Sequence, residues 1–183
     1  MISAKLFFAA MYLHLAVSIA APIGIIATAS EGWQGLAGPM ILAHLGAAVL
    51  VQAVGWICVF CSWQAYYQGK GTALRKAWKL LKLGTIPFYA VNFLWSGFCW
   101  LMLVGASRGI MVLFAPIPII FTCLLVVQSG CVAHRYLRWL IERPGGQQGI
   151  TSLLTFLQFV PVLDILSTVL LLRLTAAGEQ GAE

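Results

Sequence analysis

The chain has 183 residues, of which 61% are hydrophobic and only 9% are charged. Soluble domains carry roughly 25% charged residues, so this composition, with a mean hydropathy of +0.94, excludes an ordinary soluble domain and predicts an integral membrane protein. We interpret the net charge of +6 as topology signals and contact with anionic lipid headgroups, with no nucleic acid as a partner.

A membrane-spanning helix needs about 20 apolar residues, and the chain contains five runs of suitable length. The predicted fold class is therefore all-α, a polytopic transmembrane helical bundle of five spans that forms a single domain over residues 1–183. The spans are expected at residues 6–28, 39–67, 83–104, 110–133 and 150–172.

The first and the last apolar runs can each be interpreted in a second way, other than as a membrane-spanning helix. The first has Lys5 and an Ala-x-Ala-like site, as a signal peptide does, but it is long and contains His14 and Pro22, so we expect a transmembrane helix. The last contains Pro161 and Asp164. If that run lies in the interface, the protein has four spans.

Two basic segments, residues 68–82 and 134–149, separate the spans and are predicted to be cytoplasmic. The first repeats apolar side chains at the spacing of one helix face, so we expect a short helix at the membrane surface, with Trp78 among the headgroups. The alternative is a basic loop that only sets topology. With the N-terminus inside, nine of the eleven basic residues are cytoplasmic and two are outside, which favours an N-in, C-out orientation.

Prolines are expected to interrupt two of the later spans. Pro87 lies near the start of the third run, so that helix is predicted to kink or to begin late. Pro116 and Pro118 break the outer part of the fourth run. A break of this kind is tolerated in a membrane where protein or water satisfies the freed carbonyl groups.

Asp164 is the one acidic residue within a predicted span. A charge at the centre of a membrane costs about 2.5–3.5 kcal/mol on insertion scales, so it must be neutral, paired or next to a wet cavity. We predict a ligand-binding pocket that includes Asp164 and four further residues, namely His44, Asn92, Gln52 and Trp95. The alternative is a structural role, in which Asp164 caps irregular backbone near Pro161 or pairs with His44.

Cys58 and Cys61 form a C-x-x-C pair on one helix face. Apolar surroundings raise thiol pKa values and disfavour reactivity, so the pair is predicted to be packing residues, with a redox pair as the alternative. No metal-binding or catalytic motif occurs, so we expect no metal site and no cofactor, and the sequence favours a non-enzymatic role without deciding it.

Two stretches, residues 80–93 and 156–167, resemble a family of small multi-span bacterial membrane proteins without assigned function. The likeness covers about a quarter of the chain, and it implies a bacterial inner membrane but no chemistry.

The sequence thus predicts a protein of the cell (inner) membrane that binds or translocates a small polar or amphipathic ligand within the bundle. The alternative is a non-catalytic accessory or assembly subunit of a larger membrane complex, and a membrane thiol oxidoreductase is the third hypothesis. The expected partners are the lipid bilayer and either further copies of the chain or a larger membrane protein.

Overall fold

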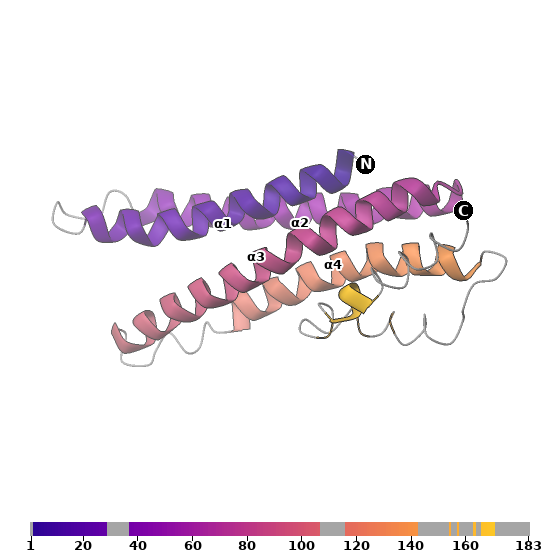
Figure 1. The fold of residues 1–183 in the computed structure, drawn as a ribbon. Helices are drawn as coiled ribbons and strands as arrows, with labels where there is room; N and C mark the ends of the chain where they lie inside the picture. The colour runs from indigo at the N-terminus through magenta and orange to yellow at the C-terminus, as the bar shows by residue number, and fades with distance from the viewer. Residues whose placement is uncertain are drawn as a thin grey trace.

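The computed structural model describes residues 2–28, 37–106, 116–142, 154, 157, 163 and 166–170. Four long helices dominate this part of the chain (Figure 1). They are α1 (Ile2–Thr28), α2 (Ala37–Tyr67), α3 (Gly71–Ala106) and α4 (Pro116–Ile141). No strand occurs within these ranges. The predicted all-α fold class is therefore confirmed for the residues that the structure describes.

The helices run alternately up and down the bundle, as Figure 1 shows. Contacts between them follow a ring in the order α1, α2, α4, α3. Successive helices α3 and α4 are antiparallel neighbours (Figure 1). Helix α3 crosses the bundle, so it packs on α1 and α4 more than on α2, to which a tight turn connects it.

The turn between α2 and α3 is a Schellman motif. Gly69 adopts a positive φ of 65°, and the flanking amides bond back into the last turn of α2: Gly69 N–H to the Tyr66 carbonyl at 3.0 Å, and Lys70 N–H to the Ala65 carbonyl at 2.9 Å. Glycine suits this left-handed position because it has no Cβ. The motif ends α2 and lets α3 begin at Gly71.

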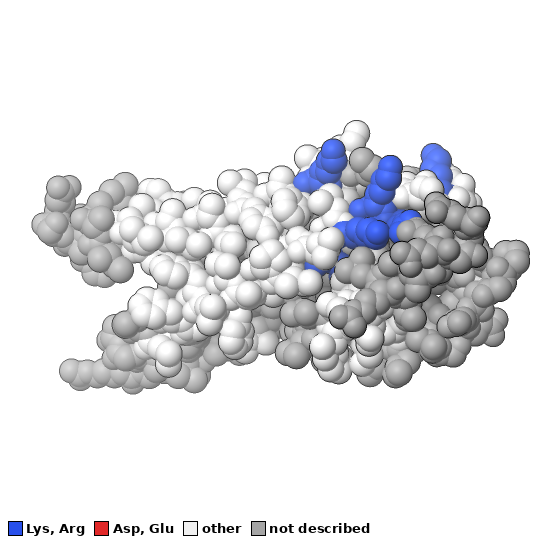
Figure 2. Space-filling view, in the orientation of Figure 1, with Lys and Arg blue, Asp and Glu red and all other residues white. Residues whose placement is uncertain are grey.

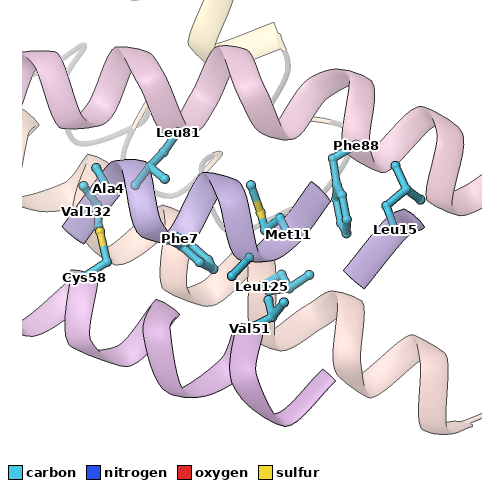
Figure 3. Close-up of a cluster of buried hydrophobic side chains, with 11 residues drawn as sticks. Ala4, Phe7, Met11, Leu15, Val51, Cys58, Leu81, Phe88, Leu125 and Val132 are labelled. Atoms are coloured by element: carbon cyan, nitrogen blue, oxygen red, sulfur yellow. The ribbon is translucent and has the colours of Figure 1, made fainter. Parts of the chain in front are cut away.

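The core between the four helices is built from aliphatic, aromatic and sulfur-containing side chains (Figure 3). Phe7 and Met11 of α1 lie at its centre, against Val51 of α2 and Leu125 of α4. Phe88 of α3 closes one side. All five are at most 1% exposed, so α1 is held by all three other helices.

A second cluster joins the basic ends of α3 and α4. Trp78 is fully buried and stacks on Tyr136, with the ring centroids 5.0 Å apart. Gly71 lies so close to Trp139 that a Cβ there would overlap the indole ring. Leu154, from the region of the fifth predicted span, belongs to the same cluster.

The basic segments differ from the prediction in one respect. Each is the continuation of a long helix: α3 runs unbroken from Gly71 through Pro87 to Ala106, and α4 runs from Pro116 to Ile141. The expectation that Trp78 lies among lipid headgroups is wrong, because its apolar stripe packs against α4 instead of the membrane surface. Pro116 begins α4, a position where its missing N–H costs little.

Within the part of the chain that the structure describes, three helices are long and apolar enough to cross a membrane, over Ile2–Gly24, Leu42–Tyr67 and Ile119–Ile141. Every Lys and Arg that the structure describes lies toward the end of the bundle formed by the N-terminus, the α2–α3 turn and the end of α4 (Figures 1 and 2). We call this the basic end. The five-span count and the orientation stay predictions.

At the opposite end the helices separate in pairs. Helices α1 and α2 form one arm and α3 and α4 form the other, and Figure 2 shows a notch between them. We call this the open end.

Candidate functional site

A polar cluster lies where α1 meets α2, within the two candidate spans. The rings of His14 and His44 are 4.9 Å apart. Ser18, one turn after His14, places its Oγ 3.2 Å from Nδ1 of His44 and 3.5 Å from Nε2 of His14. His14 also packs on Phe121 of α4, with ring centroids 4.7 Å apart. The cluster thus joins three helices.

The hydrogen bonds of Ser18 determine which groups of this cluster stay unsatisfied. Its hydroxyl donates to the His14 carbonyl at 2.8 Å, as serine often does within a helix. The tautomers that let its oxygen accept from both imidazoles carry the proton on Nδ1 of His44 and on Nε2 of His14. In this tautomer Nδ1 of His14 is an acceptor. It is buried and has no hydrogen-bond partner among the described residues.

Pro22 explains why Trp95 lies beside this cluster. Proline has no N–H, so Pro22 leaves the carbonyl of Ser18, four residues earlier in α1, without its helical donor. The indole Nε1–H of Trp95 in α3 donates to that carbonyl at 2.9 Å. The proline break is therefore satisfied by protein, as a membrane interior requires, and the N–H of Trp95 is already used.

A second polar pair lies deeper in the bundle, between α2 and α4. Nε2 of Gln128 donates to the side-chain oxygen of Gln52 at 2.8 Å and to its carbonyl at 3.2 Å. Gln52 Nε2 in turn lies 3.5 Å from the carbonyl of Phe121. Gln128 is fully buried, and its Oε1 has no partner among the described residues. Phe121 therefore connects both polar groups, through its ring to His14 and through its carbonyl to Gln52.

The structure brings together some of the predicted site residues and not others. His44 joins His14 and Ser18, whereas Gln52 pairs with Gln128. Asn92 is buried on α3 and accepts a weak hydrogen bond, 3.5 Å long, from Ser96 one turn further along its own helix. No hydrogen bond between described residues connects Asn92 to His44 or Gln52. Asp164 lies outside the described residues.

Sequence reasoning left His14, Ser18 and Gln128 out of the site. Each had a signal: His14 and Gln128 are polar residues inside apolar runs, and Ser18 is one turn from His14 and four residues before Pro22. The signal was weak because a lone polar side chain in a span does not name its partner. Pairing depends on how each helix is rotated about its axis, which the sequence alone does not fix.

The C-x-x-C pair lies away from the polar cluster. Cys58 belongs to the hydrophobic core beside Ala4 and Val132, and Cys61 is partly buried; both are free thiols. The packing role predicted for Cys58 fits this position, and the redox alternative stays a prediction from the spacing. No group of three His, Cys, Asp or Glu in the described part of the chain is placed to hold a metal ion.

At the basic end, aromatic rings and ions form a network on the surface of α2 and α4. The Glu142 carboxylate accepts hydrogen bonds from the Tyr66 hydroxyl, 2.6 Å from each carboxylate oxygen, and from Nε of Arg138 at 3.0 Å. These two bonds, that of Tyr66 first, lower the pKa of Glu142 below its ordinary value of 4.5. The guanidinium groups of Arg135 and Arg138 lie over the Tyr66 ring at 6.0 and 5.7 Å.

Comparison with known families supplies one match. A family of unknown function, DUF6652, matches residues 3–177. The chain belongs to this family. The predicted relationship to a family of unassigned function is thereby confirmed, and the match extends over nearly all of the chain instead of the expected quarter. No curated protein and no solved structure matches the chain.

Proposed function

We propose that this member of the family is an integral membrane protein that binds or translocates a small polar or amphipathic ligand at the cluster of His14, Ser18 and His44. The observation that carries the proposal is the buried, unpartnered Nδ1 of His14. Leaving such an acceptor unsatisfied costs about 1–3 kcal/mol, so a group that donates a hydrogen bond to it would recover that energy. The favoured ligands therefore carry a hydroxyl, amide or ammonium group that can donate to this nitrogen.

The notch at the open end supports a route to this cluster. His44 lies two residues after Leu42, where the second candidate span begins, and the notch opens between the α1–α2 and α3–α4 arms at that end (Figure 2). A ligand that enters there meets His44 before it meets the core around Met11. Asp164 stays part of the proposed site, as the sequence predicts, and would add a negative charge for a cationic ligand.

We infer that the basic end faces the cytoplasm and that the protein resides in the inner membrane of a bacterial cell. The gathering of basic side chains at one end supports this orientation through the positive-inside rule (Figure 2). A cysteine introduced by Lys76→Cys, in a background without native cysteines, should react with a membrane-impermeant maleimide in inverted vesicles and not in intact cells. The reverse pattern would overturn the orientation.

Native mass spectrometry of protein purified in mild detergent tests the ligand site. The wild type should carry a small-molecule adduct, and His14→Phe, which retains a ring but lacks the acceptor, should lose it. His134→Phe is the matched control, because His134 lies at the basic end of α4 outside the cluster. Asp164→Asn should also lose the adduct while it expresses and folds normally. The absence of an adduct from the wild type, or equal retention in His14→Phe, would refute the proposal.

An accessory or assembly subunit is the second candidate. A Cβ added at Gly46 of α2 or Gly97 of α3 would meet no atom within 4 Å, so both glycines lie on open surface where a helix of another protein could approach closely. Under this hypothesis Gly97→Leu leaves the protein folded but abolishes co-purification with a larger membrane protein. A wild type that purifies alone would count against it.

A further inference from the structure

A shallow groove lies on the surface of the last two turns of α2, at the basic end. Its volume is about 320 Å³, and it is lined by Phe60, Trp63, Gln64 and Tyr67. Three of these four side chains are aromatic, and Phe60 and Tyr67 are more than half exposed. The groove is thus an apolar surface that could hold a chain-like ligand lying along the helix.

A cation lies against one of the aromatic side chains that line this groove. The guanidinium of Arg135, from α4, lies 4.9 Å from the centre of the Trp63 ring, which is also a wall of the groove. The interaction between a cation and an aromatic face orients the guanidinium while leaving its N–H groups available at the ring's edge. Arg135 is therefore held by aromatic rings, and its N–H groups form no hydrogen bond with a described residue.

No acidic group among the described residues is left to pair with Arg135. Glu142 is the one acidic residue that the structure describes, and its carboxylate is occupied by Arg138 and Tyr66. Arg135 forms no ion pair with any described residue. A phosphate would pair with Arg135 through two parallel hydrogen bonds, which a guanidinium is well suited to form.

The position of the groove identifies the source of that anion. The candidate span Leu42–Tyr67 ends at the groove, so Arg135 lies near the boundary between hydrocarbon and headgroups while Phe60 reaches toward the hydrocarbon. We propose that the groove binds one anionic glycerophospholipid, with its phosphate on Arg135 and the upper part of an acyl chain along Phe60, Trp63 and Tyr67. This site is distinct from the diffuse attraction of lipids to the lysines of α3, and it does not depend on the proposed ligand site at the open end.

Native mass spectrometry with defined lipids tests the proposal. Delipidated protein in detergent is titrated with phosphatidylglycerol or phosphatidylcholine that have the same acyl chains. The wild type should bind one molecule of phosphatidylglycerol more tightly than phosphatidylcholine. Arg135→Gln should weaken phosphatidylglycerol binding about tenfold, as expected for the loss of one charge-assisted contact. Lys76→Gln, which removes the same charge from an exposed site on α3, should bind as the wild type does.

Two further measurements test the position of the acyl chain. Phosphatidylglycerol with brominated acyl chains should quench tryptophan fluorescence in the wild type, and the quenched fraction should fall in Trp63→Phe. Phe60→Ala, at an exposed position, should fold normally and bind both lipids more weakly. Equal losses in Arg135→Gln and Lys76→Gln would show diffuse attraction and overturn the site, as would unchanged binding in folded Arg135→Gln. If Arg135→Gln fails to fold, unchanged phosphatidylglycerol binding by Phe60→Ala overturns it.

Discussion

The contact between Gly55 and Gln128 makes a sharp prediction about how α2 and α4 are held together. Gly55 is buried, and a Cβ at this position would lie 2.6 Å from Cδ of Gln128 and closer still to its Oε1. No real Cβ tolerates such a contact, so Gly55→Ala must displace the Gln128 side chain. That side chain is fully buried and donates twice to Gln52. Its displacement therefore breaks the polar link between the two helices.

The expected cost follows from these contacts. A side-chain hydrogen bond between membrane helices contributes about 0.6 kcal/mol on average and up to about 1.7 kcal/mol, and overpacking of a well-packed site costs about 1–3 kcal/mol. We therefore expect Gly55→Ala to lower the free energy of unfolding by about 2–4 kcal/mol. Gly46→Ala is the matched control on the same helix, because its Cβ meets no atom within 4 Å. It should be neutral or gain up to about 1 kcal/mol from helix propensity.

Unfolding by SDS in mixed micelles, followed by far-UV circular dichroism, measures both variants. A double-mutant cycle with Gln128→Ala isolates the contact. Once Gln128 is truncated, the alanine at position 55 has room, and Gly55→Ala should cost less than about 1 kcal/mol there. Equal stability of Gly55→Ala and Gly46→Ala would refute the reasoning. So would a cost that persists unchanged in the Gln128→Ala background.

Two further predictions concern the basic end. Because its hydrogen bonds lower the pKa of Glu142, the stabilisation from this carboxylate is fully present above pH 4.5 and is lost as the pH falls through the lowered pKa. As the pH is lowered below 4.5, the thermal midpoint of the wild type should therefore fall by more than that of Glu142→Gln. Equal falls in the thermal midpoints of the two proteins would contradict this prediction. Trp78 is fully buried against Tyr136, so Trp78→Ala should lower the free energy of unfolding by about 3–5 kcal/mol. Trp78→Phe should cost much less, because it keeps a ring and removes an Nε1–H that has no partner among the described residues. Similar losses of stability in Trp78→Ala and Trp78→Phe would contradict the buried position of this ring. Trp56→Phe, at a half-exposed tryptophan, is the control.

The sequence predicted the long helices well, because apolar runs of this length have few alternatives. The second run was expected over residues 39–67, and α2 spans Ala37–Tyr67. The ends of α3 and α4 were harder to predict. The apolar stripe of Leu74, Trp78 and Leu81 would have the same spacing on a helix at the membrane surface and on a helix inside a bundle. The sequence does not show that α4 packs against this stripe, and that contact places it inside the bundle.

The candidate site was predicted less well than the fold. His44 and Gln52 were expected to share one pocket, but eight residues of helix separate them by about 12 Å, and each pairs with a different helix. His44 pairs with His14 and Ser18, whereas Gln52 pairs with Gln128. Which side chains meet depends on how each helix is rotated about its axis and where the helices cross. A sequence alone reports which side chains are polar within a span, but not which of them meet.

The two ends of the bundle differ for identifiable physical reasons, and the difference supports the proposed direction of ligand entry. At the basic end, Gly71 lets Trp139 approach the backbone of α3, and the stack of Trp78 on Tyr136 fills the space between α3 and α4. Toward the open end, Pro22 interrupts the hydrogen bonding of α1 and the bond from Trp95 to Ser18 compensates for it. That bond ties α1 to α3 one turn nearer the open end than His14, so the arms separate only beyond it. Because the basic end is closely packed, the open end stays the proposed side of ligand entry, and a ligand on that path would pass the bond between Trp95 and Ser18 before it reaches the His14 acceptor.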